Sequence, residues 1–207
     1  MNNFHKIFVI NSQKINLMKK ILFICLTIIA SALIVFPAGA QSQQPQAPPS
    51  STAKIKWLDF EEAVALNKKK PKKMFIDMYT DWCGWCKKMD AATFINPVIV
   101  EYMNQNYYAV KFNAERKDTV AFNGKQYKNP NPAGTRSSHE LAMELLSGRM
   151  SYPSFIFLDE NLNKVTVVPG YRKAPEFESI LHYIGEDAYK TQKWEEFSAS
   201  FKTTAVE

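Results

Sequence analysis

Residues 74–89 read Met74-Phe75-Ile76-Asp77-Met78-Tyr79-Thr80-Asp81-Trp82-Cys83-Gly84-Trp85-Cys86-Lys87-Lys88-Met89. The first six residues are apolar on both strand faces apart from Asp77, which predicts a central strand covered by helices on both sides. The two cysteines follow where this strand gives way to a helix. The stretch therefore predicts an α/β domain with a cysteine pair at a strand-to-helix junction.

The spacing of Cys83 and Cys86 favours thiol–disulfide chemistry. With two residues between them, the second thiol faces the first across one helical turn, so the pair can form a short, reducible disulfide. At a helix N-terminus, unpaired N–H groups and the positive end of the helix dipole favour the thiolate of Cys83. We therefore predict that Cys83 is the nucleophile and that Cys86 is the resolving thiol, which releases product from a mixed disulfide.

Other uses of the cysteine pair fit the sequence less well. A structural zinc site needs four ligands, and the mature chain adds only His139 and His182, both far downstream. Covalent haem attachment needs a histidine after the second cysteine, where Lys87 stands. A purely structural disulfide stays open, although so short a loop gains little entropy, and copper delivery lacks a nearby histidine. We expect no metal and no organic cofactor, with the Cys83–Cys86 disulfide as the redox group.

The charge of the chain gives no indication of nucleic-acid binding. Lys and Arg outnumber Asp and Glu by 26 to 20, but the first 40 residues hold four lysines and no acidic residue. Residues 41–207 carry 22 basic and 20 acidic side chains, so they lack the basic footprint that nucleic acid requires. A composition that is 46% hydrophobic and 22% charged suits one globular domain. We expect a monomer whose partners are proteins and not nucleic acid.

The first 40 residues have the three parts of a secretory signal peptide. Met18-Lys19-Lys20 precede the apolar run 21–36, and Ala38-Gly39-Ala40 provide a cleavage site. A translation start at Met18 would give this leader an ordinary length. The alternative is a retained membrane anchor, because positions 21–40 carry no charge. Both interpretations predict a periplasmic or otherwise exported protein, either free or anchored through residues 21–40.

The remaining sequence divides into a linker, a domain and a tail. Residues 41–53 lack large apolar side chains and are predicted to be a flexible linker. A domain over 54–190 is predicted to contain strands at 55–57, 74–79, 107–112, 154–158 and 164–168, and helices at 60–67, 98–105 and 175–184. The last two strands are expected to pair antiparallel. Residues 191–207 are predicted to be a C-terminal helical tail.

An insertion is predicted over residues 113–150, between two strands of the sheet. It is polar and irregular, with a hairpin signal at Asn123-Gly124 and a capping box formed by Ser137 and Glu140 before a helix over 141–146. His139 is expected to decorate the start of this helix and not to catalyse. The length of the insertion indicates a specificity or docking loop.

With these features in place, the chain resembles the thioredoxin fold superfamily over about residues 55–185. Asp77 stands six residues before Cys83, as does the buried acid of thioredoxins, and Trp82 directly precedes the nucleophile. Lys111 is similar to the strand lysine that neighbours that acid, and Tyr152-Pro153 open a strand where thioredoxins carry a cis-proline. The stretch 82–89, together with 93–97, most resembles the exported group related to the periplasmic reductase domain of transmembrane thiol:disulfide interchange proteins.

The resemblance implies a thioredoxin fold, with a central mixed β-sheet flanked by helices and an insertion before the cis-proline strand. It implies that Asp77 exchanges a proton with Cys86, because burial raises the pKa of a carboxyl, and that Lys111 supports Asp77. The residues implied to line the substrate groove are Trp82, Gly84, Trp85, Tyr152 and Pro153. Gly84-Trp85 replaces the Gly-Pro of thioredoxin, which leaves the direction of electron flow open.

We therefore expect an exported thiol–disulfide oxidoreductase that acts as a reductase or electron carrier on cysteines of envelope proteins. A transmembrane thiol–disulfide protein is the electron donor that the resemblance implies. The alternative is a protein-binding module or holdase with a thioredoxin fold. Such a module would grip its partner through the insertion and the aromatic groove without redox turnover.

Overall fold

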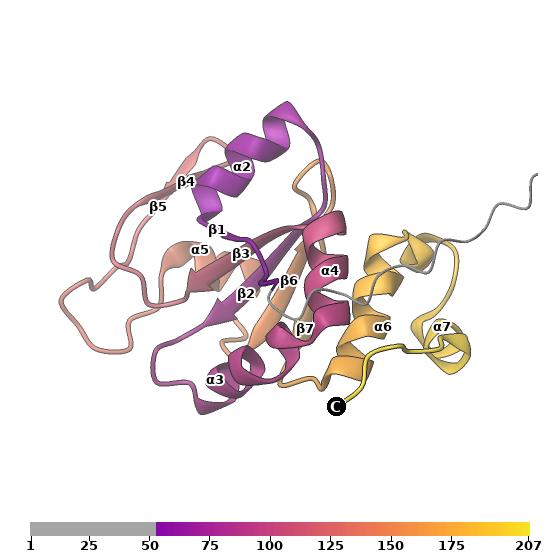
Figure 1. Cartoon of the computed structure of the whole chain (residues 1–207). Helices are drawn as coiled ribbons and strands as arrows, with labels where there is room; N and C mark the ends of the chain where they lie inside the picture. The colour runs from indigo at the N-terminus through magenta and orange to yellow at the C-terminus, as the bar shows by residue number, and fades with distance from the viewer. Residues whose placement is uncertain (1–52) are drawn as a thin grey trace, which may run out of the picture. The chain divides into compact units, whose positions relative to one another are not determined.

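The computed structural model describes residues 53–207, which are drawn in colour in Figure 1. The predicted leader over 1–40 and nearly all of the predicted linker over 41–53 lie outside the described residues. Among residues 53–207, no helix combines the length and the apolar character that a membrane span needs.

A five-stranded mixed sheet forms the centre of the domain, as predicted. Its strands lie in the order β1 (Trp57–Leu58), β3 (Tyr108–Asn113), β2 (Met74–Tyr79), β6 (Ser154–Leu158) and β7 (Lys164–Pro169). The first three strands run parallel, whereas β6 is antiparallel to both β2 and β7. β2 is the central strand and is buried along nearly its whole length, which confirms the prediction made from its apolar sequence.

Helices cover both faces of this sheet (Figure 1). One face carries α3 (Gly84–Ala91), α4 (Pro97–Asn106) and α6 (Ala174–Gly185), and the other carries α2 (Phe60–Lys69) and the insertion. Because side chains alternate along a strand, Phe75 packs under α4 and α6 while Met74, Ile76 and Met78 pack on the opposite side. Asp77 has the parity of Phe75 and so lies on the face that carries α3.

Local signals place two of the helix starts correctly. Asn96 caps α4, with its Oδ1 accepting a hydrogen bond from the N–H of Val98 at 3.1 Å, and Pro97 occupies the first helical position. Asp59 precedes α2 as predicted, although its side chain makes no capping hydrogen bond. α2 continues to Lys69, two residues beyond the predicted end.

The insertion is more ordered than its polar sequence indicated. Asn123 and Gly124 turn the predicted hairpin between β4 (Val120–Phe122) and β5 (Lys125–Tyr127), and both have positive φ, 48° and 76°. The buried apolar side chains of the insertion join the core under α2; they are Ala114, Val120, Phe122, Tyr127, Leu141, Ala142, Leu145 and Leu146. The insertion is therefore a packed subregion of the domain and not an irregular loop.

The predicted capping box in the insertion is wrong. His139, not Ser137, caps α5 (Glu140–Leu145), and its Nδ1 accepts a hydrogen bond from the N–H of Leu141 at 3.2 Å. Its Nε2 lies 3.0 Å from the carbonyl oxygen of Asp118, so the neutral ring donates there and keeps Nδ1 free to accept. Ser137 instead donates to Oδ1 of Asn129 at 2.6 Å. Full burial of the His139 ring makes it a structural cap.

The C-terminal residues are helical over only part of the predicted tail. After the short 3-10 helix η2 (Ala188–Lys190), α7 covers Trp194–Ser200, and the last residues run in extended form back along α6. The buried carboxylate of Glu178 accepts hydrogen bonds at 2.8 Å from the N–H groups of Thr204 and Ala205. This carboxylate accepts the hydrogen bonds of main-chain N–H groups that would pair with carbonyl oxygens if these residues were helical.

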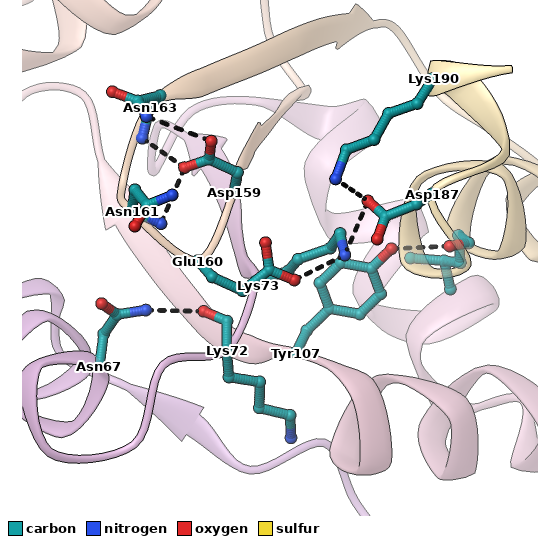
Figure 2. Close-up of polar contacts among 11 residues, drawn as sticks. Asn67, Lys72, Lys73, Tyr107, Asp159, Glu160, Asn161, Asn163, Asp187 and Lys190 are labelled. Carbon is teal, nitrogen blue, oxygen red and sulfur yellow. Dashed lines mark hydrogen bonds and ion pairs between the residues drawn. The ribbon is translucent and has the colours of Figure 1, made fainter.

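A polar cluster closes the end of the sheet at which β2 begins, opposite the cysteines (Figure 2). Nζ of Lys73 lies 2.7 Å from Oε1 of Glu160 and 3.0 Å from Oδ1 of Asp187, which is itself 2.9 Å from Nζ of Lys190. The cluster joins the start of β2 to the β6–β7 turn and to the end of α6. It contains no nucleophile, and we assign it a structural role.

Candidate active site

Cys83 and Cys86 form a disulfide at the N-terminus of α3, with their Cα atoms 5.3 Å apart. Cys83 is the N-cap residue, and its Sγ accepts a hydrogen bond from the N–H of Cys86 at 3.1 Å. A backbone donor aimed at this sulfur stabilises its thiolate. Both cysteines are buried, with 5% of the surface of Cys83 and 3% of that of Cys86 exposed. Cys83 therefore differs from Cys86 in its position as the helix N-cap and not in its exposure.

Asp77 is a buried acid with one charged partner. It lies opposite Lys111 in the β2–β3 register, and its Oδ2 is 3.0 Å from Nζ of Lys111. Its Oδ1 has no hydrogen-bond partner among the described residues. Burial raises the pKa of Asp77 to about 6, against the opposing effect of the Lys111 charge, which lowers this pKa. The carboxyl can therefore change its protonation state near neutral pH.

Lys111 is partly buried and sits between two carboxylates. Its Nζ is 2.5 Å from Oδ1 of Asp90, and three aromatic rings surround the ammonium with centroids 4.9 to 5.7 Å away, those of Tyr79, Trp57 and Phe94. Burial lowers the pKa of Lys111, but Asp77 and Asp90 together outweigh that effect and raise it. Lys111 therefore stays charged.

Asp90 connects this charged group to the redox helix. It follows Cys86 by four positions on α3, so the two side chains lie on one face of the helix. Through Lys111, Asp77 is thus linked to the face of α3 that carries Cys86. No sequence motif pointed to Asp90, although its spacing of four residues from Cys86 is a signal that could have identified it.

Aromatic side chains flank the disulfide on two sides. Trp82 and Trp85 are 51% and 57% exposed. The ring of Trp82 lies edge-on to that of Tyr152, with centroids 5.9 Å apart, and Trp85 lies 5.3 Å from Tyr171. The peptide bond between Tyr152 and Pro153 is cis. Within residues 53–207, the main chain of Tyr152 forms no hydrogen bond to another main-chain group.

Gly84 leaves space above the disulfide. A Cβ atom built on Gly84 would meet no atom within 4 Å, so the fold itself does not require glycine at the first position of α3. The missing side chain keeps the approach to the cysteines open.

The insertion reaches the site through Trp82. Oε1 of Glu115 accepts a hydrogen bond from Nε1 of Trp82 at 3.0 Å, and the guanidinium of Arg136 lies 5.2 Å from the Trp82 ring. Nδ2 of Asn129 donates to the carbonyls of Arg116 and Ser137, at 3.0 and 2.7 Å. Asn129 therefore joins the two segments that carry Glu115 and Arg136.

The structure brings most of the predicted site residues to the end of β2 at which α3 begins. Asp77 and Lys111 pair on the sheet beneath α3, while Trp82 contacts Tyr152 beside the cysteines. His139 lies apart in the insertion, packed 5.8 Å from the ring of Phe112, and burial lowers its pKa. Sequence motifs gave no signal for Glu115, Asn129, Arg136 or Tyr171, because each reaches the site from a distant segment.

Residues 53–207 contain no group of three or more His, Cys, Asp or Glu placed to hold a metal ion.

The chain is similar to several known proteins. A solved structure of the DsbH oxidoreductase is 17% identical with a TM-score of 0.46, covering 72% of this chain and 94% of that one. A solution structure of a thioredoxin from Thermus thermophilus is also 17% identical, with a TM-score of 0.48, and the match covers 63% of this chain and 87% of that one. An uncharacterised protein of Archaeoglobus fulgidus is 26% identical over 100 residues, which are 48% of this chain and 72% of that protein. The sequence model of the thioredoxin-like domain family matches residues 60–185, more than half of the chain, and the protein therefore belongs to that family.

Proposed function

We propose that this protein is a thiol–disulfide oxidoreductase that acts on cysteines of other proteins. The observation that carries the proposal is the Cys83–Cys86 disulfide at the N-terminus of α3, with the sulfur of Cys83 capping the helix. A thiolate is the nucleophile in disulfide exchange, and this position stabilises it. The free main chain of Tyr152 supports binding of an extended substrate segment beside the pair.

In the reducing direction, the Cys83 thiolate attacks one sulfur of a substrate disulfide. A mixed disulfide forms, and the other substrate sulfur leaves as a thiolate that takes up a proton. Cys86 then loses its proton and attacks Sγ of Cys83, so the internal disulfide forms and the second substrate thiol leaves. Two electrons have passed to the substrate, and an external dithiol must reduce the pair again.

Asp77 is proposed to accept the proton of Cys86 during the second attack. With its pKa raised by burial to about 6, Asp77 is mostly ionised at pH 7 and close enough to neutral to exchange protons. Asp77 is linked through Lys111 to Asp90, and Asp90 lies on the face of α3 that carries Cys86. Lys111 holds the carboxylate in place.

Serine variants of the two cysteines test the proposed reaction. We expect Cys83→Ser to abolish the acceleration that the protein gives to reduction of a protein disulfide by dithiothreitol, because the nucleophile is lost and only the uncatalysed rate remains. Cys86→Ser should instead accumulate the mixed disulfide, visible as a covalent adduct on a non-reducing gel. A double serine variant that keeps its cellular function would overturn the oxidoreductase and favour the alternative of a binding module, for which the exposed Trp82 and Trp85 supply the surface.

The finer proposal is an exported reductase or electron carrier for envelope proteins. The leader pattern at residues 18–40 supports export to the periplasm, and a transmembrane thiol–disulfide protein would supply the electrons. Equilibration of residues 41–207 in defined thiol/disulfide buffers, followed by Trp82 and Trp85 fluorescence, measures the reduction potential. We expect a value near that of thioredoxin, about −270 mV, whereas a value near −120 mV would identify an oxidant.

A further inference from the structure

Exposed apolar side chains flank the redox site and continue beside α3. In residues 53–207, the large apolar side chains with most of their surface exposed are Trp82, Trp85, Ile95 and Val206, at 51, 57, 64 and 75%. The two tryptophans flank the disulfide. Ile95 and Val206 line a cavity of about 640 Å³ beside α3. Exposed apolar groups that cluster in this way are typical of an interaction surface.

This cavity continues from the disulfide surface. We call it the α3 groove and define it by six of its lining residues, Lys88, Ile95, Pro97, Tyr171, Lys173 and Val206. Tyr171 contacts Trp85 at 5.3 Å between ring centroids, so one end of the groove adjoins the cysteine pair. The other end lies between the short 3-10 helix η1 (Thr93–Ile95) and the C-terminal residues.

The walls of the groove are held in place by hydrogen bonds. Nδ2 of Asn96 donates to the carbonyl of Val206 at 2.9 Å, next to the two N–H groups that Glu178 binds. On the opposite wall, Oγ1 of Thr93 donates to the carbonyl of Arg172 at 2.6 Å. Because both walls are already ordered, a bound segment would not have to order them.

The groove presents one lysine, Lys88, that no described carboxylate pairs. Nζ of Lys88 lies 5.0 Å from the Trp85 ring and 5.1 Å from the Tyr171 ring, and it forms no ion pair with a described residue. Glu207, the acidic residue that lines the groove, is paired with Lys173 at 2.7 Å. An acidic side chain of a partner would find Lys88 available at the end nearest the disulfide.

We propose that the α3 groove binds an extended segment of the substrate protein next to its reactive cysteine. The segment places an apolar side chain between Ile95 and Val206 and an acidic side chain at Lys88. This inference rests on the proposed oxidoreductase function and adds to it the chemistry of the preferred substrate. The groove selects disulfides whose flanking sequence is apolar and acidic.

Two peptides that contain the same disulfide and apolar residue, but carry either Asp or Lys beside it, test the charge. We expect the wild-type protein to reduce the Asp peptide at least about tenfold faster in kcat/KM, and Lys88→Glu to reverse this preference. The ratio of the two peptides cancels any effect of the charge on the cysteines themselves. Equal rates for both peptides with the wild-type protein would overturn the proposal.

The double variant Ile95→Ser, Val206→Ser tests the apolar part. Both side chains are exposed, so the fold does not depend on them, and we expect the rate ratio of the Asp peptide to a small aromatic disulfide to fall about tenfold. Gln126→Ser, on the exposed hairpin of the insertion, is the control and should leave that ratio unchanged. An unaltered rate ratio in the double variant would contradict binding of the substrate segment in the α3 groove. Failure of the wild-type protein to reduce the small disulfide would instead contradict the proposed oxidoreductase function.

Discussion

Asp77 occupies a position at which burial and charge act in opposite directions on one proton. Burial makes ionisation unfavourable, and Lys111 at 3.0 Å makes it favourable. Asp90, on the far side of Lys111, competes for the same ammonium and weakens its effect on Asp77. The outcome is a pKa of about 6, which suits a group that takes a proton from a thiol near neutral pH.

Replacing Asp77 with asparagine tests this role through the resolving step. We expect Asp77→Asn to slow resolution of the mixed disulfide by at least about a hundredfold, as for loss of a general base. In the wild-type protein the rate should rise with a pH midpoint near 6, where Asp77 ionises, and this midpoint should vanish in the variant. Single-turnover quenching between pH 5 and 8 measures both. A variant that keeps the wild-type rate and midpoint would remove Asp77 from the mechanism.

Among the elements, the insertion is the one whose position relative to the disulfide matters most. Its hairpin and α5 pack into the core under α2, and its connecting segments present Glu115 and Arg136 to Trp82. The hairpin turn was readable from Asn123-Gly124. The contacts with Trp82 were not, because nothing local in residues 113–150 indicates which distant ring they meet.

Loss of Asn129 should separate the insertion from the site. Asn129→Ala leaves the carbonyls of Arg116 and Ser137 without their buried donor, which costs about 1–3 kcal/mol of stability for each group left unpaired. We expect a shifted Trp82 fluorescence and a lower rate with a protein disulfide relative to a small one. Ser137→Ala, which removes one hydrogen bond to Asn129, is the matched control with a smaller effect. Unchanged fluorescence and rate ratio in Asn129→Ala would show that the insertion does not shape the site.

At the scale of the whole molecule, Asp77 and His139 make stability depend on pH in opposite senses. The pKa of Asp77 is higher in the folded state, so the folded state binds more protons and stability falls as pH rises from about 4 to 6. The pKa of His139 is lower in the folded state, so the unfolded state binds more protons and stability rises with pH below the ordinary histidine pKa. Both contribute to the pH profile of the wild-type protein, together with carboxyls such as Glu178, whose pKa, despite burial, is lowered by hydrogen bonds from the C-terminal residues.

A comparison with Asp77→Asn isolates the contribution of the acid. A change in pKa from 3.8 to about 6 corresponds to about 3 kcal/mol lost at pH 7, so the variant should be more stable than wild type at pH 7 by up to that amount. At pH 4 the two proteins should be nearly equal, because the folded wild type is already protonated. Denaturant unfolding of the oxidised proteins at both pH values provides the measurement. An equal difference at pH 4 and pH 7 would contradict the raised pKa.

The sequence by itself determined the parts of this protein that depend on near neighbours in the chain. The apolar run of β2, the Cys83–Cys86 spacing and the Asn96-Pro97 helix start each follow from side-chain periodicity, hydrogen bonding or backbone geometry within a few residues. The cap of α5 is the exception, since burial of His139 under tertiary contacts overrode the local preference for Ser137.

Only the tertiary structure decided which distant side chains meet at the disulfide. A contact between Lys111 and Asp77 could not be established from the sequence alone; the strand register places the two residues opposite each other, with Nζ and Oδ2 3.0 Å apart. Asp90, Glu115 and Arg136 reach the site, and Ile95 and Val206 share a groove, because folding brings remote segments together. The burial and the electrostatic environment of a side chain depend on every residue packed around it. A sequence motif contains only the residues that are near one another in the chain.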